Sequence, residues 1–211
     1  MVNRKVAYRY DAPLFVIRRD IGSHISEPIL PWYDGNDMKE KRLAAVLDNI
    51  RSVHNVGSIF RTADGAGFSE VVLCGVTPGP TDRLGRLRPD FAKVALGAEQ
   101  SLPWRKERTV GKAISRLRKE GFFVIALEQS LKSVPYTALP KRMPDKIALI
   151  VGSETRGIQP RTVKRADRIL EIPMKGEKES LNVSVAFGIA AYECARRQRK
   201  NKLPRRKRCG I

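Results

Sequence analysis

Cysteine and histidine are scarce in this sequence of 211 residues, which holds three cysteines and two histidines. The cysteines Cys74, Cys194 and Cys209 are odd in number, widely spaced and without a CxxC pair. They therefore indicate neither a disulfide framework nor a zinc site. Because His24 and His54 are the only histidines in the sequence, a histidine-based metal site is also disfavoured, and we expect no metal.

Long apolar runs are also missing. No stretch approaches the roughly 20 residues needed to span a bilayer, so we expect no membrane segment. The opening residues, MVNRKVAYRYDAPLF, contain no apolar stretch of the signal-peptide type, which predicts a cytoplasmic protein. Neither the P-loop pattern nor GxGxxG occurs. At this length the chain fits one domain with modest end extensions and can bury a core.

Negative charge is in short supply, with 22 acidic residues against 41 lysines and arginines and a formal net charge of +19. Residues 196–208, RRQRKNKLPRRKR, carry nine basic residues and no acid, and the rest of the excess is spread along the chain. Such charge favours a nucleic acid partner, because each neutralised phosphate releases counterions. An anionic membrane is the competing interpretation, but the tail lacks interleaved large apolar residues that would insert. For the tail alone, a disordered solubilising segment is the alternative.

Strand-like and helix-like patterns alternate along the chain after residue 42. Apolar strand patterns cover residues 42–50, 70–76, 122–128, 146–152 and 168–173. Helix patterns cover residues 55–67, 90–99, 109–121, 160–166 and 182–199. This alternation predicts an α/β domain with a mostly parallel sheet flanked by helices. We expect an N-terminal extension at 1–42 that packs over the core, a domain at 43–195 and a basic tail at 196–211.

Three polar segments that bear glycine follow predicted strands, where α/β sheets bind ligands. In the first, Asn55 can cap the following helix, and Gly57 permits close approach of a backbone or ligand. Arg61, nearly two turns further, offers a rigid guanidinium fork for a phosphate or carboxylate. The alternative is an ordinary helix cap with a surface Arg61 paired to Asp64.

The second segment, LIVGSETRGIQP, leaves a buried strand at Gly152 and enters a short polar turn. Glu154 places a charge at the carboxyl end of the strand, where a ligand would lie. The alternative is an exposed turn acid that pairs with Arg156 or Arg161.

The third segment, EIPMKGEKESLNVSVAFGIAAYE, spans residues 171–193. Pro173 stiffens the chain, and Ser180 or Asn182 can cap the last helix. That helix has an apolar stripe and a second stripe of small residues, Ser184, Gly188, Ala191 and Ala195. Small side chains let another backbone approach closely, either within one protomer or across a dimer, whereas ordinary helix-on-sheet packing explains the apolar stripe alone.

Taken together, NVGSIFRTADGAGF, ALIVGSETRGI and IPMKGEKESLNVSVAFGIAAYE resemble the three sequential motifs of the SpoU/TrmH family of SPOUT RNA methyltransferases. The motifs occur in the family's order and cover most of residues 49–193. The N-terminal 42 residues and the basic tail lie outside the resemblance.

The resemblance implies a C-terminal deep trefoil knot, a homodimer and S-adenosylmethionine bound in the knotted loops. The backbone around four residues is then expected to hold the cofactor: Gly152, Ile172, Met174 and Leu181. The implied reaction is methylation of a ribose 2′-hydroxyl in tRNA or rRNA.

By the same resemblance Arg61 is the catalytic residue. A guanidinium stays protonated in proteins, so Arg61 is expected to hold the adjacent phosphate and stabilise the developing alkoxide. The remaining polar motif residues are expected to position Arg61, the ribose and the cofactor loops: Asn55, Glu154, Ser180 and Asn182. The alternative function is a catalytically inactive RNA-binding protein of the same fold, which the intact Arg61, Glu154, Ser180 and Asn182 disfavour.

Overall fold

The computed structural model of the chain describes residues 41–82 and 84–199. The predicted N-terminal extension, apart from its last two residues, lies outside the described residues. So does the predicted tail from residue 200 onward. Residues 196–199 of that predicted tail belong instead to the last helix.

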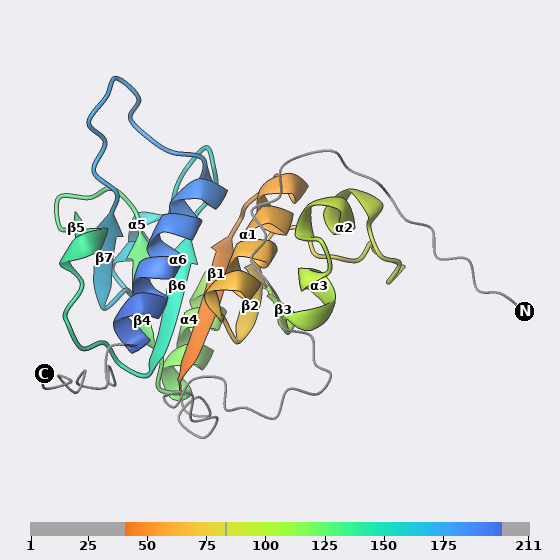
Figure 1. Cartoon of the computed structure of the whole chain (residues 1–211), viewed down its shortest axis with the longest axis horizontal. Coiled ribbons are helices and arrows are strands. Elements are labelled where there is room, and N and C mark those ends of the chain that lie inside the picture. Colours follow the sequence, from red (N-terminus) through yellow and green to blue (C-terminus); the bar gives the residue numbers. More distant parts are fainter. Residues whose placement is uncertain (1–40, 83, 200–211) are drawn as a thin grey trace, which may run out of the picture. The chain divides into compact units, whose positions relative to one another are not determined.

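One seven-stranded sheet organises the described part of the chain, in the order β3-β2-β1-β6-β4-β7-β5. Its strands are β1 Arg42–Asp48, β2 Glu70–Cys74, β3 Trp104–Glu107, β4 Phe123–Leu127, β5 Val134–Pro135, β6 Lys146–Val151 and β7 Arg168–Glu171. Every neighbouring pair runs parallel. All the strands therefore end at one edge of the sheet, as the arrowheads in Figure 1 show.

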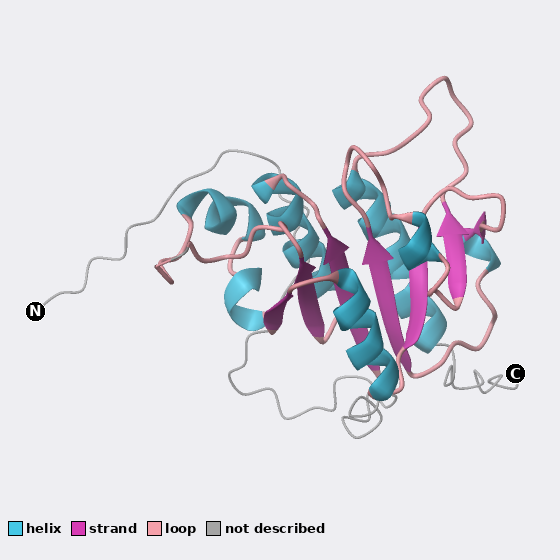
Figure 2. Cartoon of the chain, turned by 180° about the vertical axis from the view of Figure 1, so that it is seen from behind, coloured by secondary structure: helices cyan, strands magenta, loops and turns pink. Residues whose placement is uncertain are grey.

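Helices cover both faces of the sheet. The helical elements are α1 Val53–Ala66, α2 Pro89–Ala95, α3 Ala98–Ser101, α4 Val110–Lys119, the 3-10 turn η1 Tyr136–Ala138, α5 Pro160–Val163 and α6 Val183–Arg199. The helices α1 and α6 lie side by side over one face (Figure 1), and α4 crosses the other face, seen from behind in Figure 2. The predicted α/β class with a mostly parallel sheet is confirmed.

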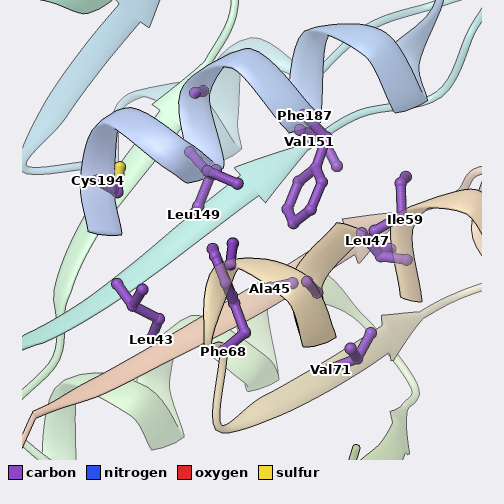
Figure 3. Close-up of a cluster of buried hydrophobic side chains, with 14 of the residues drawn as sticks. Leu43, Ala45, Leu47, Ile59, Phe68, Val71, Leu149, Val151, Phe187 and Cys194 are labelled. Carbon is purple, nitrogen blue, oxygen red and sulfur yellow. The ribbon is translucent and has the colours of Figure 1, made fainter. Parts of the chain in front are cut away.

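The central strands are buried on both sides, which is why their sequences are unbroken apolar runs. In β1, Leu43, Ala45 and Leu47 join the core under α1 and α6, while Ala44 and Val46 join the core under α4. The same alternation continues in β6, because successive side chains of a strand point to opposite faces. Figure 3 shows the first core, with Phe187 and Cys194 of α6 above strands β1 and β6.

Two edge strands, β3 and β5, were not predicted from the sequence. The strand β3 contains Arg105, Lys106 and Glu107, and β5 is two residues long. Short and charged strands are usual at sheet edges, where they discourage pairing with other chains. They lack the apolar alternation by which a strand is recognised.

The helix α1 begins at Val53, two residues before the predicted start at residue 55. Ser52 is its N-cap, and the Ser52 hydroxyl accepts a hydrogen bond from the Asn55 backbone N–H. The prediction that Asn55 caps this helix is therefore wrong, and the Asn55 side chain is available for another contact. At the other end Gly67 closes the helix in a left-handed conformation with φ of 81°.

The last helix packs against α1 through its small side chains. Ala191 and Ala195 are buried, and a Cβ added to Gly188 would lie 3.5 Å from Thr62 Cγ2 of α1. The small-residue stripe thus serves a close contact within the chain. At the C-terminal end of α6, Gln198 Nε2 donates to the Asp145 carbonyl over 2.9 Å, which ties the helix to the start of β6.

Candidate functional site

Three loops meet at the carboxyl edge of the sheet, as the sequence predicted from strand assignments alone. They follow β1, β6 and β7. The second and third predicted segments begin at the latter two loops, and the first lies in α1, directly after the loop that follows β1. In Figures 1 and 2 the loop after β7 rises well beyond the ends of the strands.

Glu154 joins the loop after β6 to the start of α1. Its carboxylate accepts a hydrogen bond from Asn55 Nδ2 over 2.9 Å. It also accepts from the backbone N–H groups of Arg51 and Ser52, over 3.3 and 3.4 Å. Among the described residues, all three of these hydrogen-bond donors to Glu154 belong to the start of α1 or to the two residues before it. Glu154 therefore bridges two segments of the chain, which pairing with Arg156 or Arg161, the alternative from the sequence, would not do.

The protonation of Glu154 follows from these contacts. Partial burial by itself raises the pKa of the Glu154 carboxyl, but the hydrogen bonds from the Asn55 side chain and from the backbone outweigh it, so the pKa lies below its usual value. A lowered pKa means that the ionised carboxylate stabilises the fold above the ordinary carboxyl pKa. This contribution is lost as the pH falls through the lowered value, so Glu154 is a carboxylate at neutral pH.

Asn182 extends the network to the third segment. Its Nδ2 donates to Asn55 Oδ1 over 3.1 Å, while its Oδ1 accepts from the Ser184 backbone N–H over 2.9 Å. Asn182 therefore caps α6 and at the same time holds the side chain of Asn55. The chain Glu154–Asn55–Asn182 unites all three predicted segments, and we call it the asparagine bridge.

The loop after β6 is folded tightly upon itself. Ser153 and Gly157 pair as an antiparallel bridge, and a Cβ added to Gly152 would overlap the backbone of Gly157. The carboxylate of Glu128, at the end of β4, accepts from the Ile158 backbone N–H over 2.5 Å. Gly152 is therefore required for the loop to close, and Glu128 anchors its far side.

Arg61 and Ser180 do not join the asparagine bridge. Arg61 is exposed on α1, six residues after Asn55 or about 9 Å along the helix axis. Ser180 is exposed in the loop before α6. No hydrogen bond is recorded for either side chain among the described residues, and no ion pair joins Arg61 to Asp64 there.

A pocket of about 500 Å³ lies in the loop after β7. Its lining includes Ile172 and Met174, two of the residues expected to hold the cofactor, together with Glu171, Glu177 and Glu179. Gln129 Nε2 donates to the Glu179 carbonyl over 2.7 Å, which connects the pocket to the end of β4. The other two expected residues lie outside this lining. Gly152 is buried in the neighbouring loop, and Leu181 is partly exposed before α6.

Sequence reasoning missed two acids at this edge, Glu128 and Asp48, as functional candidates. Both stand at the carboxyl end of a strand, so the rule that selected Glu154 would have found them. Within residues 41–82 and 84–199, no group of three or more His, Cys, Asp or Glu residues is placed to hold a metal ion. No helix in that part of the chain is long and apolar enough to cross a membrane.

Comparison with known proteins identifies relatives that match most of the described region. A family model for the SpoU rRNA Methylase family matches residues 42–192. The 23S rRNA (guanosine-2′-O-)-methyltransferase RlmB of Salmonella typhi is 30% identical over 172 residues, which are 79% of this chain and 67% of that protein.

Two solved structures are also similar. The AdoMet-bound rRNA methyltransferase from Sinorhizobium meliloti superposes with a TM-score of 0.67 at 29% identity, covering 75% of this chain and 57% of that one. The A. aeolicus TrmH/SpoU tRNA modifying enzyme has a TM-score of 0.64 at 28% identity, covering 76% and 78%. This chain thus spans little more than half of the first structure.

The closure of the loop after β6 generates a stability prediction. Replacing Gly152→Ala should lower the free energy of unfolding by about 1–3 kcal/mol, the usual cost of overpacking, because the new methyl group meets backbone that cannot turn aside. Thermal and chemical unfolding measure the loss. Gly79→Ala is the control, since its Cβ would find the nearest atom, on the side chain of Trp104, at an ordinary 3.4 Å. Equal stability of the two variants would contradict the predicted loop packing.

Proposed function

Because this chain belongs to the SpoU rRNA methylase family, we propose that it transfers a methyl group from S-adenosylmethionine to a ribose 2′-hydroxyl of RNA. The asparagine bridge is the observation that carries the proposal. It brings the three segments of the family resemblance, which are far apart in the sequence, into one hydrogen-bonded unit at the carboxyl edge of the sheet. A structural scaffold would not require such polar groups to converge there.

The pocket in the loop after β7 fits the methyl donor. Its volume of about 500 Å³ falls within the roughly 300–1,000 Å³ of sites for molecules of that size. Glu171, Glu177 and Glu179 line it together with Lys178, and the excess of negative charge suits a cofactor with a cationic sulfonium and an ammonium group. When bound, the cofactor supplies a methyl group on a sulfonium that departs as a neutral thioether.

The asparagine bridge sets the geometry of the reaction rather than moving the proton. Glu154 is ionised and already accepts three hydrogen bonds, so it is a poor general base. Its role is to hold Asn55, and through Asn55 to hold Asn182 at the start of α6. Positioning of this kind contributes strongly to catalysis when the reacting groups must align.

Arg61 is the proposed catalytic residue. Its guanidinium remains charged and exposed, so it can bind the phosphate beside the target ribose and stabilise the alkoxide that develops there. Among the described residues, Arg61 has no contact with the asparagine bridge of its own chain. We therefore propose that it acts in the active site of another chain. A second protomer is the natural source.

We propose accordingly that the active protein is a homodimer. On α6, Val185 and Tyr192 are each about half exposed, and Leu181, just before the helix begins, is partly exposed. Large apolar side chains grouped on one exposed face mark interaction sites. This face adjoins α1, so a partner seated on it would bring its own Arg61 close to the asparagine bridge.

The RNA substrate is proposed to be ribosomal or transfer RNA in the cytoplasm. The relatives named above act on one or the other, and a formal net charge of +19 suits either polyanion. We also propose the deep trefoil knot, in which the segment leading into α6 threads the loop after β6. The contacts of Asn182 with Asn55 and of Gln129 with the Glu179 carbonyl agree with that path.

Loss of the guanidinium tests the catalytic assignment. Arg61→Ala should reduce methyl transfer to RNA at least about 100-fold, as removal of a single charge-stabilising donor does, while calorimetry finds the affinity for S-adenosylmethionine unchanged. The matched control is Arg142→Ala, an exposed arginine that precedes β6 and so lies away from the carboxyl edge of the sheet. Near-normal turnover by Arg61→Ala would refute the assignment. Absence of cofactor binding by the wild-type chain would favour the inactive RNA-binding protein.

A charge on the exposed face of α6 tests the homodimer. Val185→Glu should raise the dimer dissociation constant at least about tenfold, because the carboxylate would lose its hydration in an apolar interface. Sedimentation equilibrium measures the change. Leu131→Glu is the matched control, since Leu131 is fully exposed in the loop after β4. A wild-type chain that sediments as a monomer at all concentrations would contradict the proposal.

The basic tail offers a test of RNA binding. Deletion should begin at residue 200, because Arg196 and Arg197 are paired with Glu193 within α6. Residues 200–211 contain six basic residues. If all of them neutralise phosphates, their removal should lower the slope of log affinity against log salt by about 4, measured by filter binding over a salt series. An unchanged slope would assign the tail to the solubilising role.

A further inference from the structure

A second pocket opens at the same edge, between the ends of β1, β2 and β6, and we call it the edge pocket. Its volume of about 190 Å³ is well below the roughly 300–1,000 Å³ of pockets for drug-sized molecules, so it has room for a single ring system. The residues that line it include Asp48, Asn49, Arg51, Val76, Arg156 and Gln159. The proposed function assigns it no role.

Asp48 gives the edge pocket a buried acceptor. The residue is 4% exposed, and the hydrogen bond recorded for its side chain among the described residues comes from Asn49 Nδ2 over 2.7 Å. A carboxylate has about four acceptor positions, and a buried one is costly unless they are satisfied. Burial raises the pKa of Asp48, against the opposing effects of the Asn49 hydrogen bond and the charge of Arg161. Most of its acceptor capacity is left for a molecule in the pocket.

The side chain of Asn49 is oriented so that its Nδ2 donor faces the carboxylate of Asp48. Its backbone is in the left-handed region with φ of 58°, which is uncommon outside glycine. Its Oδ1 accepts from the Val76 backbone N–H over 3.2 Å, so its Nδ2 is the group turned to Asp48. A Cβ at Gly75 would collide with the Asn49 side chain, so the glycine is required for this arrangement.

The rest of the edge pocket suits a base attached to a phosphate backbone. Arg51 and Arg156 are exposed and can bind phosphate at the rim, whereas the buried charge of Asp48 disfavours a phosphate deeper inside. Val76 is 65% exposed and offers an apolar surface to a ring. A base that leaves the stack is read by contacts of both kinds, on its face and along its hydrogen-bonding edge.

Residues that line the edge pocket are sequence neighbours of Glu154 in the asparagine bridge. Ser153 and Thr155 line it, and Glu154 lies between them in the sequence. The backbone N–H of Arg51, another lining residue, donates to Glu154. A base in this pocket would therefore lie beside the groups that position the ribose.

We infer that the edge pocket binds a base of the substrate RNA with its N–H-bearing edge toward Asp48, and that it favours guanine. The inference rests on the proposed function, because it takes RNA as the substrate. Guanine presents its ring N1–H and its 2-amino group side by side, and one carboxylate can accept from both. Adenine and cytosine offer one amino group beside an acceptor. Uracil offers one N–H between two carbonyl oxygens, which a carboxylate repels.

Mononucleotides test the inference without turnover. The full chain, with and without S-adenosylmethionine, would be titrated with guanosine, inosine and uridine 5′-monophosphates and followed by NMR. The guanosine nucleotide should bind about fivefold or more tightly than the uridine nucleotide, in keeping with base discrimination by paired hydrogen bonds. The inosine nucleotide, which lacks the 2-amino group, should bind more weakly than the guanosine nucleotide. This comparison needs no variant.

Replacing the acceptor provides the matching change in the protein. Asp48→Asn should remove the preference among the three nucleotides, because an amide presents a donor where the carboxylate presents an acceptor. Its affinity for S-adenosylmethionine should equal that of the wild type, which shows that the fold is intact. Asp90→Asn is the control, since Asp90 is an exposed acid at the start of α2, and it should keep the preference.

Three results would overturn the inference. One is a uridine nucleotide or inorganic phosphate that binds as tightly as the guanosine nucleotide, which would make the pocket a phosphate site. Another is an Asp48→Asn variant that keeps the preference or loses cofactor binding. The third is absence of nucleotide binding at millimolar concentrations. Failure of the wild-type chain to bind S-adenosylmethionine would instead count against the proposed function, and the nucleotide preference is read separately from it.

Discussion

The carboxylate of Glu154 is the contact on which the arrangement of the site depends. It stands on the loop after β6, yet its hydrogen-bond donors belong to the segment that begins α1. Asn55 passes the connection on to Asn182, which caps α6. One ionised group thus fixes the relative positions of three loops that share no sequence proximity. The low pKa of Glu154 keeps this connection charged at neutral pH.

The parallel sheet makes such a connection possible. Because all seven strands run in the same direction, the loops after β1, β6 and β7 leave from one edge. There β1 and β6 are adjacent, and β4 alone separates β6 from β7. That edge carries two pockets with different chemistry. The lining of the pocket after β7 includes three acids and one lysine, and the pocket has room for the methyl donor, while the edge pocket has one buried acid and a basic rim. The asparagine bridge connects the loop after β6, which lines the edge pocket, with Asn182, which follows the segment that lines the pocket after β7.

Much of the fold, and the edge of the sheet at which the site lies, could be predicted from the sequence, and particular residues show why. Buried strands such as Lys146–Val151 are unbroken apolar runs, so the sheet and its functional edge followed from pattern alone. The edge strand Trp104–Glu107 is charged and was missed. Asn55 was taken for a helix cap because its side chain suits that role, but Ser52 fills it. The partner of Glu154 lies about a hundred positions away, and no local pattern encodes such a contact.

The central claim is that Asn55 and Asn182 act as one unit in methyl transfer, and a double-mutant cycle between them tests it most directly. The rate of methyl transfer to RNA would be measured for Asn55→Ala, Asn182→Ala and the double variant. Residues that share a hydrogen bond couple by about 0.5–3 kcal/mol, so the double variant should lose clearly less activity than the product of the single losses. Losses that multiply to within about 0.3 kcal/mol would show two independent residues and contradict the account.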